Sequence, residues 1–459
     1  MSLDNSVVLK SLHEHFALDP KTSKILVVGL GHTGVSVAHY LQKLGFHFAI
    51  TDSRDKPPLK DAFFEVMPDT PIFTGGFDES AFQVATHLVV SPGVSLTEKS
   101  IIKALTNGAK LVSDIDLLVC SVNAPIVAIT GSNGKSTVTT MLGEMAKIAG
   151  KHVAVGGNLG TPALDLLDKK ADLYVLELSS FQLERTSTLN AAAATVLNIS
   201  ADHLDRHNDI ASYGEIKQRV YNGDGVLVIN LDDPLVKDMQ DSQRKSFTFS
   251  IKHTAADFYI DSMEGQQYLM HNREALMSLT QLPLEGRHNA ANALAAIALG
   301  YAVGLDETLM CNALKVFKGL DHRMQKVATI RGVTWVNDSK ATNIGACVAA
   351  LDGYDTKVVL IAGGDAKGAD MNELTPFIKE KTKSVVLIGK DANLIAQAIN
   401  GCVPVYFAKN MEQAVQMGAE IAIEGDSVLL SPACASLDQY KNYQDRGNQF
   451  SKAVLRLLA

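Results

Sequence analysis

Residues 128–137, with the sequence Ala-Ile-Thr-Gly-Ser-Asn-Gly-Lys-Ser-Thr, constrain this chain more than any other stretch. The apolar run 126–129 is typical of a buried strand, and the residues after the stretch have the apolar spacing of a helix. Glycines in such a turn let backbone N–H groups surround an anion, and the helix N-terminus adds positive potential. Lys135 and Ser136 can then reach a phosphate and a Mg²⁺ ion. The stretch therefore predicts a nucleotide-phosphate loop.

The loop is a shortened form of the general phosphate-loop pattern, because Ile129 stands where that pattern has its first glycine. The part that remains is Thr-Gly-x-x-Gly-Lys-Ser-Thr. A plain turn between strand and helix would not require the Lys-Ser-Thr triplet. We expect a nucleotide to contact Gly131, Ser132, Asn133, Gly134, Lys135, Ser136 and Thr137.

A second glycine-rich turn, at residues 29–34, follows an apolar strand and precedes a helical pattern. The next strand ends at Asp52. A G-x-G-x-x-G turn with an acid at this distance is the fingerprint of dinucleotide binding, and taken alone it predicts an NAD enzyme. A UDP-sugar offers the same diphosphate and sugar, so both ligands stay open at this point. Residues 91–93, Ser-Pro-Gly, end another strand, either as a ligand contact or as a tight turn.

Two strands after the phosphate loop lead into polar residues. Glu177 ends the strand 173–176, where an acid beside a phosphate loop commonly holds Mg²⁺; a solvent-exposed strand end is the alternative. His203 follows the strand 195–198, in a segment with two acids and two histidines. We interpret His203 as a metal or substrate ligand.

Two helical patterns of the middle third carry further polar residues. Lys217 lies one residue past the apolar face of the helix 212–220, so its spacing alone indicates a surface lysine. Asn292 lies inside an alanine-rich helix that ends near Gly300. Asparagine is a poor helix former, and a polar task such as contact with a base edge would explain it.

Four apolar strands of the last third end in polar or glycine-rich turns. They lie at 333–336, 358–362, 385–388 and 428–431. Helical patterns between some of them predict a doubly wound α/β domain with its ligand edge at the strand C-termini. Arg323 ends the apparent linker 318–323 and suits a phosphate.

Length and composition limit the class of protein. A chain of 459 residues exceeds the size of one hydrophobic core, so we expect two or three domains. The net charge of −8 and the absence of a basic run argue against nucleic acid or an anionic membrane as the main partner. Five scattered cysteines indicate a reducing compartment, and no apolar run reaches the roughly 20 residues of a membrane span. These features predict a cytoplasmic protein.

Together the motifs resemble the Mur ligase family of peptidoglycan synthesis along essentially the whole chain. Family-wide features are the loop 130–137, Gly157-Asn158, Glu177, Asp202-His203 and the segment 286–292. Features of the members that add D-glutamate are the turn 29–34 with Asp52-Ser53-Arg54, the segment 337–343 and the tail 431–447. The diaminopimelate motif of another member, Asp-Asn-Pro-Arg, is absent. Two residues depart from the pattern: His32 replaces an apolar residue and Tyr443 replaces a phenylalanine.

The resemblance implies an α/β fold of three domains. Residues 1–113 would form a Rossmann-like domain that binds the UDP substrate. Residues 114–319 would form a central P-loop ATPase-like domain that binds ATP, and residues 320–459 a Rossmann-like domain that binds the amino acid. Groups on three domains can converge only if the third closes onto the central one, with Gly319-Leu320 as a hinge.

The implied activity is ATP-dependent addition of D-glutamate to UDP-N-acetylmuramoyl-L-alanine through an acyl phosphate, by a cytoplasmic monomer with no nucleic-acid partner and no membrane insertion. Two Mg²⁺ ions are implied, one on Ser136 and Glu177, the other on His203 and on Lys217, which is a carbamate in this family. Lys135, Glu177, His203 and Lys217 form the implied catalytic set.

The remaining implied contacts divide by substrate. ATP would also contact Asn292, Arg323 and Asp338. D-glutamate would contact Lys340, Thr342, Ser436 and Tyr443. The UDP substrate would contact Gly31, His32, Thr33, Asp52, Ser53, Arg54, Ser91, Gly93, Asn158 and His203.

Three other functions compete with this one. An NAD dehydrogenase would use the turn 29–34 but leaves the phosphate loop unexplained. A nucleotide-binding module without activity would not need Glu177, His203 and Lys340. Another Mur-type or folylpolyglutamate-type ligase would share the phosphate loop but not the tail 431–447.

Overall fold

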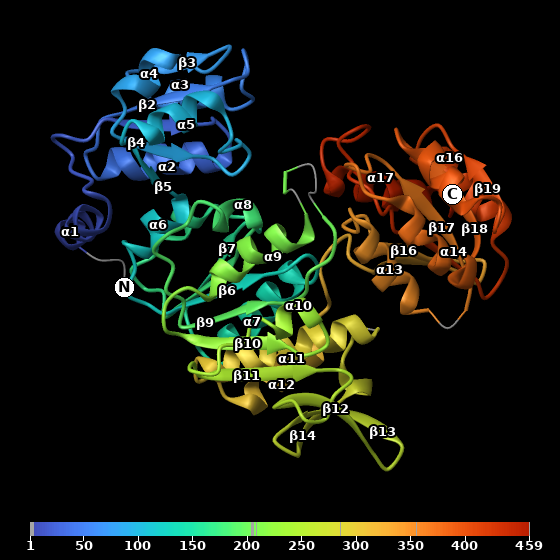
Figure 1. Ribbon diagram of the computed structural model, residues 1–459. Coiled ribbons are helices and arrows are strands. Elements are labelled where there is room, and N and C mark those ends of the chain that lie inside the picture. The colour runs from blue at the N-terminus through green and yellow to red at the C-terminus, as the bar shows by residue number, and fades with distance from the viewer. Residues whose placement is uncertain (1–3, 203–205, 208, 285, 355, 459) are drawn as a thin grey trace.

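The strands among the described residues form three separate sheets that follow one another along the sequence. The computed structural model describes residues 4–202, 206–207, 209–284, 286–354 and 356–458. In Figure 1 the N-terminal unit, in blue, and the C-terminal unit, in orange and red, both lie against the central unit, in green and yellow. The predicted α/β class with three domains is confirmed, whereas the boundaries at 113 and 319 stay predictions.

The first sheet is parallel throughout, in the order β3-β2-β1-β4-β5. Its strands are β1 (Ile25–Val28), β2 (Phe48–Asp52), β3 (Ile72–Thr74), β4 (His87–Val90) and β5 (Lys110–Val112). The helices are α1 (Asn5–Phe16), α2 (His32–Lys43), α3 (Lys60–Val66), α4 (Glu79–Val84) and α5 (Lys99–Thr106). The strand order reverses between β1 and β4, so the turns after these two strands meet at the crevice where doubly wound sheets bind ligands.

The central sheet has nine strands in the order β14-β13-β12-β11-β10-β9-β6-β8-β7. They are β6 (Ile126–Thr130), β7 (Val153–Gly157), β8 (Leu173–Glu177), β9 (Ala193–Val196), β10 (Val226–Asn230), β11 (Ser246–Ser250), β12 (Phe258–Met263), β13 (Gln266–His271) and β14 (Glu274–Ser278). Its helices are α6 (Asp114–Val119), α7 (Lys135–Ile148), α8 (Ser180–Leu183), α9 (Ile210–Gln218), α10 (Pro234–Lys237), α11 (Arg287–Ala302) and α12 (Glu307–Val316), with a 3₁₀ turn η1 (Ala163–Leu166). Pairing is parallel from β7 to β12 and antiparallel through β13 and β14.

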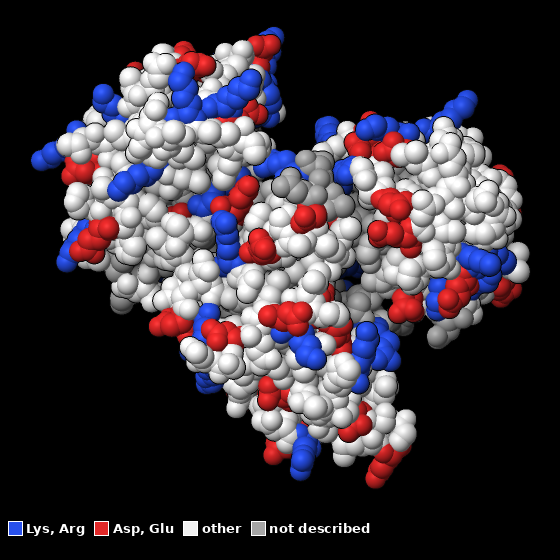
Figure 2. Space-filling view, in the orientation of Figure 1, with Lys and Arg blue, Asp and Glu red and all other residues white. Residues whose placement is uncertain are grey.

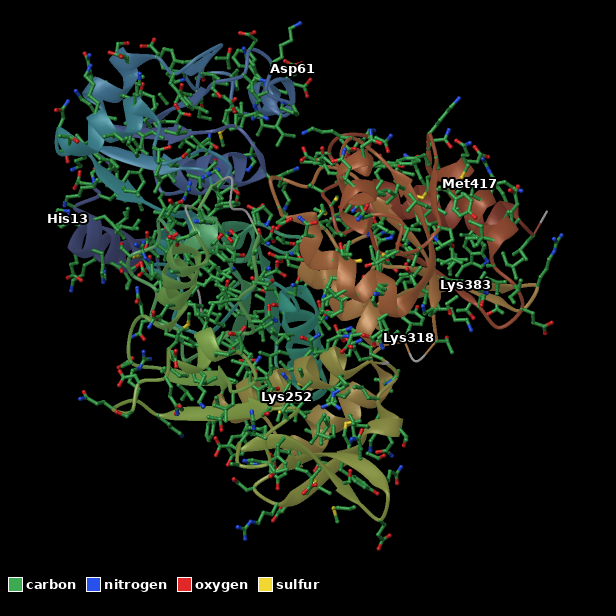
Figure 3. All side chains as sticks on the ribbon, turned by 45° about the vertical axis from the view of Figure 1, so that its right-hand side comes forward. His13, Asp61, Lys252, Lys318, Lys383 and Met417 are labelled. Atoms are coloured by element: carbon green, nitrogen blue, oxygen red, sulfur yellow. The ribbon has the colours of Figure 1, made fainter. Side chains whose placement is uncertain are left out.

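The third sheet has six strands in the order β15-β16-β20-β17-β18-β19, of which only the β15–β16 pair is antiparallel. They are β15 (Gln325–Ile330), β16 (Val333–Asn337), β17 (Val358–Gly363), β18 (Thr382–Ile388), β19 (Val405–Phe407) and β20 (Ser427–Leu430). The helices are α13 (Ile344–Asp352), α14 (Thr375–Lys381), α15 (Ala392–Ile399), α16 (Met411–Ile421) and α17 (Tyr443–Arg456). In Figure 3, Lys318 marks the place where the chain passes from the central to the third domain.

The hydrophobic cores show how the domains are joined. One cluster of buried side chains continues from the first domain into the central one, and it includes Val27 and Leu41 together with Ala128 and Leu176. The third sheet has two clusters of its own, one on each face. The first two domains therefore share apolar packing, whereas the third is packed separately. Among the described residues, no helix is long and apolar enough to cross a membrane.

Candidate active site

The phosphate loop follows β6 and begins α7, as the sequence predicts. Gly134 is the N-cap of α7 with φ of +87°, a conformation that side chains rarely adopt. A Cβ atom at Gly134 would lie 2.5 Å from Oδ1 of Asn292, so the backbone has to be bare at this point. The segment after β9 braces the loop, because the amide of Asn198 accepts from the N–H of Asn133 at 2.8 Å and donates to its carbonyl at 3.0 Å.

Lys135 folds back over this loop. Its Nζ donates to the carbonyl oxygens of Gly131 at 2.8 Å and Ser132 at 2.9 Å. Burial lowers the pKa of Lys135, and the charges of Glu177 and Asp202 act against that effect. An anionic phosphate would supply the charge that this ammonium group needs.

Glu177 ends β8 directly beside the loop and is 3% exposed. Its Oε1 accepts a 2.6 Å hydrogen bond from Nδ2 of Asn158, whereas its Oε2 is buried without a partner among the described residues. Burial alone would raise the pKa of Glu177, but the charges of Lys135 and Lys340 outweigh it and the pKa is lowered. A buried, ionised carboxylate oxygen without a partner fits a divalent cation.

Lys217 lies on α9 and is 1% exposed, so the spacing that indicated a surface lysine was misleading. Its Nζ donates to the carbonyl of Gly131 at 2.9 Å and lies 4.5 Å from the ring centroid of Tyr213. Burial lowers the pKa of Lys217 well below its ordinary value, with a further contribution from the charge of Lys135. Lys217 is buried because the phosphate loop covers this side of α9. The outcome is a buried amine next to the phosphate loop, in surroundings that favour its neutral form.

A cavity of about 280 Å³ opens between the central and third domains. Its walls include Asn133, Gly134, Asn292, Arg323, Asp338 and Lys340, six of the residues expected to bind ATP or D-glutamate. His288 of the segment 286–292 also lines it, together with Phe249, which the sequence analysis did not single out. Loop, helix and linker residues that are far apart in the sequence are thus brought to one cavity.

Arg323 and Asp338 both lie in the wall of this cavity. Burial raises the pKa of Asp338 to about 7, and the positive charge of Arg323 opposes that shift. Oδ2 of Asp338 accepts from the hydroxyl of Ser431 at 2.9 Å, and Oδ1 accepts from the N–H of Met324 at 3.3 Å. Nε of Arg323 is buried and has no partner among the described residues. A guanidinium with a free donor at a cavity wall suits an anionic or sugar oxygen.

The loop after β16, in the third domain, contacts the phosphate loop of the central domain. Nζ of Lys340 donates a 2.6 Å hydrogen bond to Oγ of Ser136 and lies 5.2 Å from the ring centroid of Tyr443. Burial lowers the pKa of Lys340 to about 8, and the charge of Arg323 lowers it further. Lys340 of the third domain therefore contacts the phosphate loop directly.

The other residues expected to contact D-glutamate lie around this loop. Thr342 lines a small pocket together with Asp202, Asn343 and Lys367. Ser436 is buried at a turn, where its carbonyl accepts from the N–H of Tyr440. Figure 2 shows the surface hollowed between the first and third domains, so a long substrate has room to extend from one to the other.

Lys367 is a site residue that the sequence analysis missed. Its Nζ forms a 3.0 Å ion pair with Asp202 of the central domain, and Nδ2 of Asn343 donates to the same carboxylate at 3.0 Å. The available signal was its place just after the Gly-Gly turn that ends β17. A lysine at a strand end, facing another domain, offers a cation for an acidic substrate.

The first domain holds its expected ligand residues at the edge formed by the ends of β1, β2 and β4. Gly31 is the N-cap of α2, and the exposed helix start continues with His32 and Thr33. Oδ2 of Asp52 accepts from the N–H of Leu30 at 2.7 Å. Asp52 also accepts two hydrogen bonds from the guanidinium of Arg54, at 2.8 and 2.6 Å.

The remaining residues expected on this domain follow the same strand ends. Ser53 follows Asp52 directly and is exposed. Ser91 is buried and donates to the carbonyl of Gly29 at 3.0 Å, which joins the turn after β4 to the turn after β1. Gly93 has open space around it, since nothing lies within 4 Å of a Cβ built there.

The residues predicted for a second metal ion lie only partly within the described residues. His203 lies outside the described residues, so its proposed role stays a prediction. Among the described residues, no three His, Cys, Asp or Glu side chains gather as a metal site. Three other groups lie at the loop: the hydroxyl of Ser136, the carboxylate of Glu177 that Ser136 influences, and the amine of Lys217 that donates to Gly131.

These features define a three-domain α/β protein whose phosphate loop lies at a cavity shared with the third domain. Three family models match the chain: "Mur ligase MurD-like, N-terminal domain" at 23–113, "Mur ligase middle domain" at 129–300, and "Mur ligase, glutamate ligase domain" at 322–434. The chain belongs to the Mur ligase family.

Curated relatives are similar over nearly the whole chain. The UDP-N-acetylmuramoylalanine--D-glutamate ligase of Methylococcus capsulatus is 52% identical over 436 residues, which are 95% of each chain. The ligase of the same name from Nitrosococcus oceani is 48% identical over 438 residues, which are 95% of this chain and 97% of the relative.

Solved structures share the fold at low sequence identity. A pseudomurein peptide ligase type C from Methanothermus fervidus has a TM-score of 0.64 at 19% identity and covers 95% of this chain and 100% of its own. UDP-N-acetylmuramate-alanine ligase from Thermotoga maritima has a TM-score of 0.61 at 18% identity, with the same coverage. A folylpolyglutamate synthase from Mycobacterium tuberculosis has a TM-score of 0.56 at 17% identity and covers 73% of this chain and 91% of its own.

Proposed function

We propose that this chain is an ATP-dependent ligase that joins the amine of D-glutamate to the carboxylate of UDP-N-acetylmuramoyl-L-alanine, a step of peptidoglycan precursor synthesis. The observation that carries the proposal is the cavity between the phosphate loop and the third sheet, in a chain 52% identical to a curated ligase of this name. A nucleotide-binding module alone would not need a second sheet with cationic side chains directed at its phosphate loop.

ATP would bind across the domain boundary. The base and ribose fit the 280 Å³ cavity, where Asn292, Arg323 and Asp338 supply polar contacts. The phosphates would lie on residues 131–137, where bare backbone and the start of α7 attract anions. Lys135 would exchange its two carbonyl partners for phosphate oxygens.

Magnesium fits the residues beside the loop. Ser136 and Glu177 would hold one ion, because the Oε2 atom of Glu177 has no partner among the described residues and its pKa is lowered. Mg²⁺ would neutralise charge on the transferred phosphoryl group and orient it. A second ion, on Lys217 as a carbamate and on His203, is part of the proposal. A neutral, buried lysine amine is the form that combines with CO₂, with loss of one proton, to give a carbamate anion.

The reaction would proceed in two displacements. A carboxylate oxygen of the UDP substrate attacks the γ-phosphorus, and the bond from phosphorus to ADP breaks. The amine of D-glutamate then attacks the acyl carbon, the bond to phosphate breaks, and the nitrogen loses a proton. Neither step requires a protein nucleophile, but both need positive groups near the negative charge that develops. Lys135 and Lys340 would supply these groups, since both contact the phosphate loop.

The substrates would reach this point from opposite sides. The UDP part would bind the turns at 29–34 and 91–93 of the first domain with Asp52, Ser53 and Arg54, and Asn158 would contact the sugar-linked end. D-glutamate would bind the third domain at Thr342, Ser436 and Tyr443. Lys367 would pair with one of its carboxylates in place of Asp202.

An ADP-release assay with each substrate omitted in turn tests the function. We expect ADP and phosphate to form in equal amounts only when ATP, Mg²⁺, the UDP substrate and D-glutamate are all present. L-glutamate and diaminopimelate serve as control amino acids, and a folate with L-glutamate tests the folylpolyglutamate-type alternative. Turnover with the folate, or no turnover with D-glutamate, would contradict the proposal.

A further inference from the structure

An arginine outside the proposed ligand sets connects the first domain to the central one. Arg185 follows α8, eight positions after Glu177, and its side chain is 0% exposed. It belongs to the central domain, but its guanidinium contacts the backbone of the first. Nη1 donates to the carbonyls of Val90 at 3.1 Å and Ser91 at 2.6 Å, and Nη2 donates to the carbonyl of Val94 at 3.3 Å.

The carbonyl of Val90 ends β4, and those of Ser91 and Val94 belong to the turn that follows, the turn that also carries Gly93. Backbone carbonyls at the end of a strand need donors from outside the ladder. A guanidinium can supply several donors in fixed directions from one side chain, which a lysine or glutamine cannot. Glu184, at 3.2 Å, provides a nearby negative charge for the buried cation.

The turn does not depend on Arg185 for its own shape. Within the first domain, the N–H of Ser91 donates to Val28 at 2.8 Å and the N–H of Val94 donates to Ser91 at 2.9 Å. The hydroxyl of Ser91 adds the bond to Gly29. Arg185 therefore attaches a turn that the first domain already forms by itself to the central domain.

Other contacts join the two domains away from the ligand edge. The hydroxyl of Ser36 on α2 donates to Asp165 at 2.6 Å, and Tyr40 bonds Ser121 at 2.7 Å. A shared apolar core lies under them. These contacts hold the domains together, while Arg185 fixes the ligand-binding turn itself.

We propose that Arg185 is a positioning residue: it fixes the turn 91–94 against the central domain, so that a substrate bound through its UDP part presents its far carboxylate at the phosphate loop. The inference rests on the proposed function. Because Arg185 acts between domains, its loss should weaken ligands that span both domains and spare ligands that contact only one.

Steady-state kinetics on the full chain can test this with Arg185→Ala and Arg185→Lys. We expect KM for UDP-N-acetylmuramoyl-L-alanine to rise about tenfold in Arg185→Ala and less in Arg185→Lys, the loss expected for a few hydrogen bonds to a charged donor. The inhibition constant of UDP alone, which reaches only the first domain, and KM for ATP should each change by less than about twofold. Arg219→Ala is the matched control, since exposed Arg219 bonds the carbonyl of Glu184 within the central domain.

Each outcome decides the question. A fall in kcat with unchanged KM would overturn the positioning role, because loss of folded protein lowers the amount of active enzyme and leaves KM as it was. Equal weakening of UDP and of the whole substrate would also overturn it, because the effect would then lie within the first domain alone. If Arg185→Ala does not fold, Arg185→Lys gives the same comparison. If the unmodified protein shows no turnover with D-glutamate, the proposed function fails. Arg185 is then tested by direct titration: its loss should weaken binding of the whole substrate and leave binding of UDP nearly unchanged.

Discussion

Lys340 of the third domain donates a 2.6 Å hydrogen bond to Ser136 of the central domain, 204 positions earlier in the chain. Ser136 belongs to the phosphate loop, and both residues lie beside Glu177. The third domain thus contributes a cation directly to the place where a phosphate would lie. The position of the third domain and the charge at the phosphate loop are therefore coupled through the side chain of Lys340.

The coupling predicts a pH dependence. Burial lowers the pKa of Lys340 to about 8, so the ammonium form is present below that pH and is lost as the pH rises through it. We expect kcat/KM for ATP to fall above a pH of about 8. Lys340→Arg should move this decline to higher pH, because a guanidinium stays charged. Rate profiles of both proteins between about pH 6 and about pH 10 test the prediction, and identical alkaline limbs would contradict it.

A second prediction concerns the bare backbone at Gly134. Gly134→Ala should lower the free energy of unfolding by about 1–2 kcal/mol from the positive φ, and ATP affinity should also fall because the new Cβ meets Asn292. Gly150→Ala, at the other end of the same helix, is the control: its φ is +76° and nothing lies within 4 Å of a Cβ there. We expect the control to lose stability but keep ATP binding, as measured by thermal melting and nucleotide titration. Equal ATP affinity in both variants would exclude a role for close approach at Gly134.

A third prediction concerns the buried amine of Lys217. Lys217→Ala should be nearly inactive, and added short carboxylic acids should restore part of the activity if a carbamate is the working form. Lys217→Met keeps most of the volume and should not be rescued, since no space is left for the acid. The measurement is ADP release with and without acetate or propionate. A fully active Lys217→Ala variant would leave Lys217 with no catalytic role despite its burial.

Much of the fold could be predicted from the sequence, because the buried parallel strands are short apolar runs that end in glycine or polar turns. The strand predicted before the turn 91–93 is β4, and the predicted strand 126–129 differs from β6 by one residue. The expected strand 195–198 begins and ends two residues later than β9. The reason is that β9 begins with two alanines, which are only weakly apolar. Strands β15 and β19 of the third sheet were missed. β15 contains Gln325, Lys326 and Thr329, and β19 has only three residues.

The site was predictable where chemistry is local and not where it depends on packing. The phosphate loop can be recognised in the sequence because its glycines, its lysine and its hydroxyl residues are neighbours along the chain. Lys217 looked exposed because helical spacing does not show that a loop from elsewhere covers the helix. The contacts of Arg185 and Lys367 could not be predicted for a related reason. Arg185 contacts the carbonyls of another domain, and Lys367 contacts Asp202, 165 positions away. Contacts between domains lie beyond any local pattern.

The last prediction concerns the dinucleotide-type turn of the first domain. All four acceptor positions of the Asp52 carboxylate are occupied by N–H donors: Leu30, the backbone of Arg54 and two guanidinium nitrogens of Arg54. In dinucleotide-binding proteins the corresponding acid accepts from ribose hydroxyls, for which Asp52 has no free position. We expect NAD neither to raise the melting temperature nor to compete with the UDP substrate, whereas UDP should do both. The half-exposed guanidinium of Arg54 is then the group that meets the ligand.

If Asp52 acts by holding Arg54, the two residues form one unit. Asp52→Ala and Arg54→Ala should each raise KM for the UDP substrate by about tenfold, with little effect on KM for ATP. The double variant should be no worse than either single one, because the second change removes nothing that the first left in place. Lys56→Ala, a nearby lysine on the exposed loop before α3, is the control and should leave KM unchanged. Additive losses in the double variant would show that Asp52 contacts the ligand independently of Arg54.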